Sequence, residues 1–577
     1  MRRTRAAHAA LVLARVLLAA SPAYIHPDEF FQAPEIAAGD ILGVDVLRTW
    51  EFAPLAPVRS IAPIYLYAGT PLALLRAAGW LLQRLGGWRL ELTPWRLVCV
   101  SRAFMAVASL AVDACLVRAV RRLNPGARMQ ATMLLLASSH CLAVLCCHTF
   151  ANAFAAIVLA ACLDLLSLIE ARCVRRAAGS VALPCAALGA ALALGAFTHL
   201  TFGAFALPLG VAAAAMLARY ARRGLLAVAG GGAAAALGLM AADRLYYGSS
   251  TPTVLNNLRY NSSRSNLAAH GIHPWYMHLA VSLPVLFGPL ALLAAAKAWC
   301  WARAPASWSR TSYLSAAAAG SVVVGLAALS AVPHQEPRFL IPALPGLVLC
   351  TWRWHRLALA RFWYLWVAFN VILAVAFGVV HQAGVVPVLG YVSSTSVLPA
   401  VDCRSVPSDP AHAVCTAATG STHASTAAGT DPPRVRTRVL FVSTYMAPRH
   451  LLAQPVAPDA LQARVELHDL VGMDDGEIRR EIGRSVHVSC SLLRQSNGSE
   501  LVVRQTRPGR FERTLVVLPA STDMARIEPP DAAAGYELVP LYSYRPHVDF
   551  DDIAAVLRHP WQRARLGVFA VCANAPS

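Results

Sequence analysis

Long apolar runs, separated by short polar segments, fill the first two thirds of the chain. A membrane-spanning helix takes about 20 residues, and apolar runs of this kind lie near residues 7–24, 61–83, 97–118, 129–147, 150–169, 180–197, 201–218, 223–242, 277–299, 312–331, 338–352 and 362–381. Several are short or adjoin each other, so we expect roughly nine to twelve spans. The pattern predicts an all-α polytopic membrane domain over residues 1–390.

The pattern changes at two places. Between the first two apolar runs lies a polar, proline-bearing loop, residues 25–60, whose helix-like stretch Pro34 to Leu47 suits the membrane surface. The segment 391–433, rich in Ser, Thr, Ala and Pro from Val401 onward, predicts a linker. Residues 434–577 carry strand-like runs and predict a small soluble α+β domain.

Composition agrees with a bilayer setting. Hydrophobic residues make up 57% of the 577 residues and charged residues 14%, against about 25% charged in soluble domains. The formal charge of +19 comes mostly from arginines that bracket the apolar runs. The positive-inside rule predicts arginines at the ends of membrane spans, and we prefer this explanation of the charge to nucleic-acid binding.

The N-terminus combines arginines with an Ala-rich run, Ala6 to Ala23. This resembles a cleaved signal peptide as well as a first membrane span. The many later runs favour a retained span, with the arginines in the cytosol and the following loop on the opposite side.

The most informative motif is His26 to Glu35, which places the carboxylates of Asp28, Glu29 and Glu35 within eight residues. Just outside the hydrocarbon, carboxylates can stay charged. One of them can then act as a general base, a role worth about 10²–10⁴-fold in rate. The alternative for Asp28 is an ordinary helix cap.

Two later polar clusters point to ligand binding. The cluster Asn266 to His278 sets three histidines among Asn, Trp and Tyr, which suits sugar hydroxyls and pyranose faces or, alternatively, a capped loop. The cluster Pro333 to Phe339 is either an exposed turn with a weak Glu/Arg pair or a cationic site for phosphate.

Cysteines divide between the two parts of the chain. Ten lie in the membrane part and are most simply buried apolar residues. Cys403, Cys415, Cys490 and Cys572 lie in the tail and can pair in an oxidising compartment, with three pairings open. Glycosylation sequons begin at Asn261 and Asn497, and use of the latter would make the tail luminal.

These motifs, with Arg48 to Phe52, Asp243 to Gly248 and His381 to Val385, resemble the dolichyl-phosphate-mannose-dependent α-mannosyltransferases of glycosyltransferase family 22. The resemblance extends from about residue 24 to 386, with an echo at Thr444 to Leu451. It implies a GT-C glycosyltransferase fold whose acidic first luminal loop forms the active site.

The resemblance also implies a reaction and a location. Mannose passes with inversion from dolichyl phosphate mannose to the third mannose of a GPI-anchor precursor, forming an α-1,2 bond at the luminal face of the endoplasmic reticulum membrane. No metal, nucleotide sugar or other cofactor is implied. The expected partners are the two lipid substrates and the membrane, without nucleic acid.

Site residues follow from motif and chemistry together. Asp28 is the expected base, and Glu29 orients the acceptor or shares the site. The leaving lipid phosphate calls for fixed cations, and we expect Arg338, with His334 and His273 as secondary candidates and Glu336 in the same donor site. His148 and His199 stand where relatives often carry arginine, so we leave both unassigned.

Two other functions stay open. One is a different family member, which adds the third GPI mannose or a mannose of the dolichol-linked N-glycan precursor. The other is a membrane transporter or scramblase, which predicts inverted repeats with paired broken helices. The sequence shows no such repeat, and its acids gather in loops.

Overall fold

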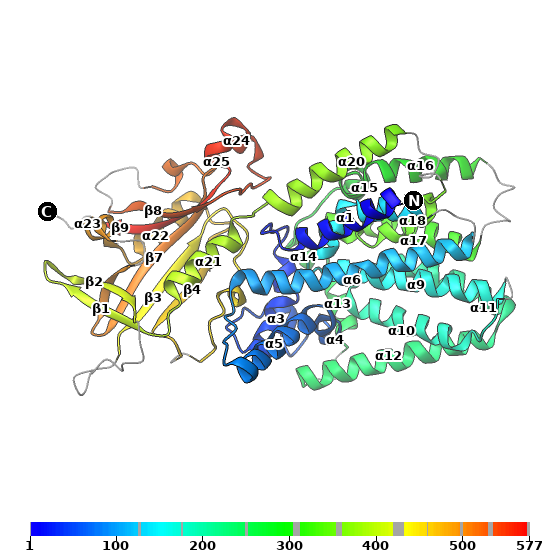
Figure 1. The fold of residues 1–577 in the computed structure, drawn as a ribbon, viewed down its shortest axis with the longest axis horizontal. Coiled ribbons are helices and arrows are strands. Elements are labelled where there is room, and N and C mark those ends of the chain that lie inside the picture. Colours follow the sequence, from blue (N-terminus) through cyan, green and yellow to red (C-terminus); the bar gives the residue numbers. More distant parts are fainter. Residues whose placement is uncertain are drawn as a thin grey trace.

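A helical bundle and a β-sheet unit make up the molecule (Figure 1). The computed structural model describes residues 2–124, 129–174, 177–248, 252–303, 312–353, 360–418, 432–457, 460–496, 500–528 and 535–573. Helices fill the described chain up to α21 (Val385–Ser396), and the named strands follow it. A helical membrane domain with a C-terminal α+β unit is therefore confirmed.

The described part of the bundle has seven helices long and apolar enough to cross a membrane, or up to nine if each of two bent pairs is one span. The seven are α4 to α5 (Ile61–Gly86), α6 (Pro94–Leu123), α9 (Ala151–Cys173), α11 (Phe202–Tyr220), α12 (Arg223–Tyr247), α17 (Tyr313–Ser330) and α20 to η7 (Ala360–Val380). The bent pairs join α7 (Gln130–Ala137) to α8 and η3 (His140–Cys147), and η4 and α15 (His278–Phe287) to α16 (Pro289–Ala302). Three further helices lie at predicted spans: α1 (Arg2–Ala19), which carries several arginines, the apolar α10 (Ala182–Thr198) and the short α18 (Ala343–Thr351).

Helices α1 and α6 run antiparallel, which fixes the end of the bundle where the first loop lies. Arg15 of α1 pairs with Asp113 of α6 at 2.7 Å. Just beyond the C-terminal end of α1, the carbonyls of Ser21 and Ala23 accept hydrogen bonds from the Arg102 guanidinium, nearer the start of α6, each at 2.7 Å. The end of α1 thus meets the start of α6, and the chain between them begins and finishes at one end of the bundle.

The apolar stretch Ile61–Gly86, predicted as a span, therefore belongs to this loop. Its second part, α5 (Thr70–Gly86), packs against α3 (Pro34–Leu42), and Arg76 donates to the Ile41 carbonyl at 2.8 Å. Large apolar side chains remain exposed on α5: Leu74, Trp80, Leu81 and Leu85. Such a face suits the membrane surface. Hydropathy did not reveal that this stretch belongs to the loop, because hydropathy measures the length and composition of a helix and not its direction.

The sheet unit lies at the loop end of the bundle (Figure 1). In the described chain, strands run in the order β1-β2-β6-β7-β3-β4, and β9 joins β5, β7 and β8. Their bounds are β1 (Val401–Val406), β2 (Asp409–Ala417), β3 (Arg434–Phe441), β4 (Ala463–Asp469), β5 (Val488–Ser489), β6 (Leu501–Arg507), β7 (Arg510–Pro519), β8 (Glu537–Tyr544) and β9 (Leu566–Ala573). Accompanying helices are α22 (Asp475–Arg484), α23 (Cys490–Gln495), α24 (Ile553–Arg558) and α25 (Pro560–Arg563). Strand β3 is parallel to β4 and β7 and apolar where it is buried on both faces, as central parallel strands are.

The linker predicted over 391–433 is wrong for its middle part. Strands β1 and β2 form an antiparallel hairpin there, closed by a disulfide between Cys403 and Cys415. Ala413 and Cys415 are fully buried against neighbouring strands. The hairpin mixes small apolar residues with Ser, Thr, Pro and charged residues, so composition concealed a strand pair that pairing with β6 stabilises. Residues 419–431 lie outside the described residues.

The second disulfide, Cys490 to Cys572, completes the pairing that the sequence left open. It joins the start of α23 to β9 within the sheet unit. Of the two sequons, Asn497 lies outside the described residues. Asn261 ends α13 (Thr253–Asn261), and its side-chain amide donates to the Asn257 carbonyl at 2.9 Å.

Candidate active site

The motif His26 to Glu35 folds as one helical turn, α2 (Asp28–Phe31), followed by α3. Phe30 and Phe31 are buried and anchor the turn. Successive residues of a helix point about 100° apart. Asp28 and Glu29, although adjacent, therefore meet different surroundings.

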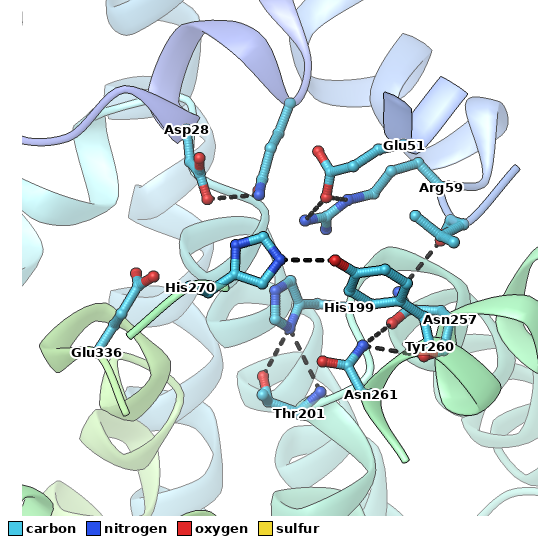
Figure 2. Close-up of polar contacts among 12 residues, drawn as sticks. Asp28, Glu51, Arg59, His199, Thr201, Asn257, Tyr260, Asn261, His270 and Glu336 are labelled. Carbon is cyan, nitrogen blue, oxygen red and sulfur yellow. Dashed lines mark hydrogen bonds and ion pairs between the residues drawn. The ribbon is translucent and has the colours of Figure 1, made fainter. Parts of the chain in front are cut away.

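Asp28 lies at the loop end of the bundle, on the same side of the site as Glu336 (Figure 2). Its carboxylate accepts a hydrogen bond from Gln32 Nε2 at 2.5 Å and pairs with Arg338 Nη2 at 2.5 Å, while 27% of the side chain stays exposed. Burial alone would raise the pKa of Asp28, but the Arg338 guanidinium outweighs it and holds the pKa below its usual value. Asp28 is therefore an ionised carboxylate that a substrate can reach.

Glu336 occupies another side of the same guanidinium. It forms an ion pair with Arg338, accepts a hydrogen bond from His334 Nε2 at 3.0 Å and lies 3.8 Å from His26 Nε2. Burial would raise the pKa of Glu336, yet Arg338 and His334 lower it far below its usual range. The hydrogen bond to Glu336 in turn raises the pKa of His334.

Arg338 is thus held between two carboxylates from distant parts of the chain. The short helix η6 (Pro337–Leu340) carries it, and only 9% of its side chain is exposed. His273 lies beside this cluster, with its ring centroid 6.1 Å from that of His334 and its Nδ1 accepting from the Gln335 amide. The residues predicted for the donor site therefore gather around Asp28.

Glu29 lies in the interior of the protein and, unlike Asp28, is not exposed. Its carboxylate is fully buried and accepts two hydrogen bonds from Arg102, at 2.6 and 2.9 Å. The Thr149 hydroxyl donates to the Glu29 carbonyl at 2.9 Å. Burial raises the pKa of Glu29 against the opposing effect of Arg102. In this geometry Glu29 fastens the loop to α6 and does not reach an acceptor, contrary to the role we expected.

Glu35 fastens the same loop to the sheet unit, a role the sequence did not indicate. Its carboxylate accepts from the backbone amides of Leu47 at 2.8 Å, Arg449 at 3.1 Å and His450 at 3.3 Å. The His450 ring also hydrogen-bonds to it. Nearby, the Tyr24 hydroxyl donates to the Met446 carbonyl at 2.9 Å. The segment Thr444 to Leu451, noted as an echo of the family pattern, therefore supports the first loop.

A second group of polar side chains, the second wall of the site, lies across from Asp28 (Figure 2). Arg59 donates from Nε and Nη2 to one oxygen of Glu51, at 2.9 and 2.7 Å. His199, which follows α10, bonds the Thr201 hydroxyl through Nδ1 at 2.8 Å. Burial first, and then Arg59 and Arg338, lower the pKa of His199 to about 3. His199 is therefore a neutral imidazole at neutral pH.

Helix α13 and the loop after it complete this wall (Figure 2). Asn257 donates to the Val58 carbonyl at 3.1 Å, and Asn261 donates to the Asn257 side chain at 2.6 Å. The Tyr260 hydroxyl hydrogen-bonds to His270 Nε2 at 2.9 Å. The wall thus offers amide, hydroxyl and imidazole groups.

Our sequence reasoning did not assign Glu51, Arg59 or Tyr260, and it left His199 aside because it stands where relatives often carry arginine. The available signal was position: His199 directly follows an apolar run, and Glu51 and Arg59 flank the end of the first loop. Position alone does not identify partners, because these residues meet only when α10, α13 and the loop pack together.

The site combines a carboxylate base with a fixed guanidinium. That pair suits a displacement in which a hydroxyl loses its proton and an anion leaves. Among the described residues, one group offers three ligand atoms of the kind that bind metals, namely Cys490, Glu537 and Cys572. It lies in the sheet unit, where the disulfide occupies both sulfurs.

Comparison with known proteins gives consistent results. A model of the Alg9-like mannosyltransferase family matches residues 7–416. GPI mannosyltransferase 4 of Aspergillus oryzae is 30% identical over 561 residues, which cover 94% of this chain and 93% of the relative. GPI alpha-1,2-mannosyltransferase 4 of Homo sapiens is 33% identical over 501 residues, covering 81% and 78%. Among solved structures, ArnT from Cupriavidus metallidurans bound to undecaprenyl phosphate is similar with a TM-score of 0.45 and 17% identity, covering 64% and 63%.

Proposed function

Because the chain belongs to the Alg9-like mannosyltransferase family, and is thus a multi-pass membrane mannosyltransferase acting on lipid-linked substrates, we propose that it adds the fourth mannose to a GPI-anchor precursor. The new bond is an α-1,2 linkage to the third mannose. The names of the relatives support this proposal: the A. oryzae protein is a GPI mannosyltransferase 4 and the H. sapiens protein a GPI alpha-1,2-mannosyltransferase 4.

The donor in this proposal is dolichyl phosphate mannose, with no metal and no nucleotide sugar. Its mannose is β-linked, so an α-linked product requires inversion at the anomeric carbon. The 2-hydroxyl of the acceptor attacks that carbon, Asp28 takes the hydroxyl proton, and the bond to the lipid phosphate breaks. The observation that carries this role is that, of the three carboxylates in the motif His26 to Glu35, Asp28 alone is partly exposed, at 27% of its side chain, while Glu29 and Glu35 are fully buried.

Arg338 stabilises the leaving phosphate in this mechanism. Its guanidinium is shared by Asp28 and Glu336, so the donor phosphate must exchange with one of them to bind. Exchange with Asp28 would free this carboxylate to accept a proton at the moment the donor is in place. His334, with its raised pKa, adds positive charge beside the phosphate. His273 contributes a further polar contact.

The proposed setting is the endoplasmic reticulum membrane, with the site on the luminal side. Both disulfides lie in the sheet unit, at the same end of the bundle as Asp28. Disulfides persist in oxidising compartments such as this lumen. The arginines at the start of α1 belong at the opposite, cytosolic end under the positive-inside rule.

The test uses microsomes from cells that lack the corresponding transferase. Wild-type protein receives dolichyl phosphate mannose and a three-mannose GPI precursor, beside an Asp28→Asn variant of equal abundance. We expect a four-mannose lipid from wild type, sensitive to an α-1,2-specific mannosidase, and almost none from the variant.

Each other outcome removes a defined part of the proposal. If wild type instead elongates a two-mannose GPI precursor or a dolichol-linked oligosaccharide, the acceptor assignment fails and the enzyme class stands. If Asp28→Asn is as active as wild type, Asp28 is not the base.

A further inference from the structure

A ridge of three rings runs along the wall opposite Asp28, and the proposed chemistry leaves it unused. Trp50 of η1 (Trp50–Phe52) stacks on Tyr260 with ring centroids 4.3 Å apart and an interplanar angle of 29°. The Tyr260 hydroxyl bonds His270 Nε2 at 2.9 Å. Two segments far apart in sequence, one around Trp50 and one from Tyr260 to His270, thus build one surface.

The ridge leads without interruption to the catalytic cluster. The His270 ring lies 5.7 Å from that of His334, measured between centroids. His334 Nε2 is 3.0 Å from Glu336, which shares Arg338 with Asp28. Figure 2 shows Tyr260 and His270 between the carboxylates on one side and the asparagines of α13 on the other.

Exposure indicates that the outer ring serves a ligand. Within the same short helix, Phe52 is 4% exposed and anchors the loop, whereas Trp50 is 46% exposed. A tryptophan needed only for packing would be expected to turn inward, as Phe52 does. Trp50 instead gives one face to Tyr260 and leaves half of its surface free.

The groups at the rim of the ridge suit a sugar. Glu51 follows Trp50 in the chain and holds Arg59 at 2.7 Å, and it contributes with burial to a raised pKa of Tyr260. A pyranose ring has an apolar C–H face bordered by hydroxyls. Aromatic faces bind the C–H face, and nearby carboxylate, guanidinium and imidazole groups bind the hydroxyls.

We propose that Trp50, Tyr260 and His270 form the subsite for the non-reacting sugars of the acceptor glycan. The terminal mannose then lies at Asp28, and the preceding sugars extend along the ridge toward Trp50. The inference rests on the proposed function, because it assumes a linear mannosyl acceptor. It adds the residues that recognise the length of this acceptor.

The experiment compares two synthetic acceptor lipids, one with a single α-mannose and one with three. For Trp50→Ala we expect KM for the three-mannose acceptor to rise about tenfold, the size of effect that loss of an aromatic contact produces. Removal of uniform binding raises KM and leaves kcat unchanged, and KM for the donor should not change. The single-mannose acceptor does not reach Trp50, so its KM should stay near the wild-type value.

Three variants serve as controls. Trp50→Phe keeps a stacking face and should recover most of the affinity. Tyr260→Phe keeps the ring and removes the bond to His270, so it should raise the same KM by a smaller factor. Trp561→Ala removes a tryptophan that is 84% exposed on α25 of the sheet unit, and it should match wild type.

The proposal is overturned if Trp50→Ala and Tyr260→Phe both leave KM for the three-mannose acceptor unchanged. It is also overturned if they affect both acceptors equally or raise KM for the donor. If wild type elongates a different glycan lipid, the acceptor of the proposed function is wrong, and the ridge is judged by the same comparison of long and short forms of that lipid.

Discussion

The open and the buried sides of the first loop show how one acidic motif serves two purposes. Asp28 lies on the open side, shares Arg338 with Glu336 and has a lowered pKa. Glu29, the next residue, lies on the buried side with both oxygens on Arg102 and has a raised pKa. The chemical group is the same on both sides, and access to substrate separates the two roles.

This difference concerns what surrounds the proposed base and what surrounds its buried neighbour. A buried ion pair contributes little net stability, but loss of one partner is costly. The pair on the buried side therefore makes the loop rigid, and the partly exposed pair on the open side can exchange partners. Variants on the open side should consequently lose activity, and variants on the buried side should lose stability.

The strongest way to break the comparison is Asp28→Asn, with an expected loss of about 10²–10⁴-fold in kcat. The amide cannot take a proton, while Arg338 keeps Glu336 as its partner. Mannose transfer should therefore fall without a change in the thermal unfolding of the purified protein. If the variant loses activity and stability together, Asp28 has a structural role like that of Glu29.

The next largest effect should come from Glu29→Gln, measured as stability. Arg102 would be left as a buried charge without its carboxylate, at a cost of about 3–5 kcal/mol. We expect a lower unfolding temperature and a lower yield of folded protein. The control is the double change Glu29→Met with Arg102→Met, which removes both charges and should recover much of the loss. If Glu29→Gln is stable but inactive, Glu29 acts in catalysis.

Sequence reasoning succeeded where chemistry limits the choice of residues. The family resemblance is confirmed, and Asp28, His334, Glu336 and Arg338 meet in one cluster although they come from two distant parts of the chain. A carboxylate base and a fixed cation leave few candidates in so apolar a sequence. Their roles in catalysis stay predictions.

Sequence reasoning failed where packing decides. Nothing in the local sequence distinguishes Asp28 from Glu29. The helical turn α2 points these adjacent residues about 100° apart, and the packing around each then decides its exposure. Hydropathy predicted a span near residues 61–83, and the helix there is long and apolar enough to cross, but the chain before and after it lies at the same end of the bundle. The hairpin of β1 and β2 had the composition of a linker, and only its register with β6 makes it a strand pair.

A sharper form of the comparison uses Arg338→Gln and pH. Asp28 works as a carboxylate, so activity is lost as pH falls through its pKa, which Arg338 holds below the usual value. Without the guanidinium, burial and Glu336 both raise that pKa. The acid limb of kcat/KM should therefore move to higher pH, and kcat should fall by about 10²–10³-fold for loss of a charge-stabilising group.

Arg338→Lys is the matched control, since it keeps a positive charge between the carboxylates. Its acid limb should stay closer to that of wild type, although it loses the two-sided geometry of the guanidinium. Equal pH profiles for wild type and Arg338→Gln would show that another group sets the state of Asp28.

The smallest expected effect concerns Glu35, which tests whether the buried side extends into the sheet unit. Glu35→Gln keeps an oxygen for the backbone amides of residues 449 and 450 but loses the charge-assisted bond to the His450 ring, a change worth about 1–3 kcal/mol. We expect earlier proteolysis of the sheet unit and a kcat a few-fold lower, with both KM values unchanged, because the loop is displaced and not its binding groups. His450→Ala should have the same effects as Glu35→Gln. Because both changes remove the same contact, the double variant should be no more impaired than the more impaired of the two single variants. Asp475→Asn, which breaks an exposed ion pair with Arg526 in the same unit, should change neither readout. Unchanged kcat in both interface variants would mean that the sheet unit covers the loop without positioning Asp28.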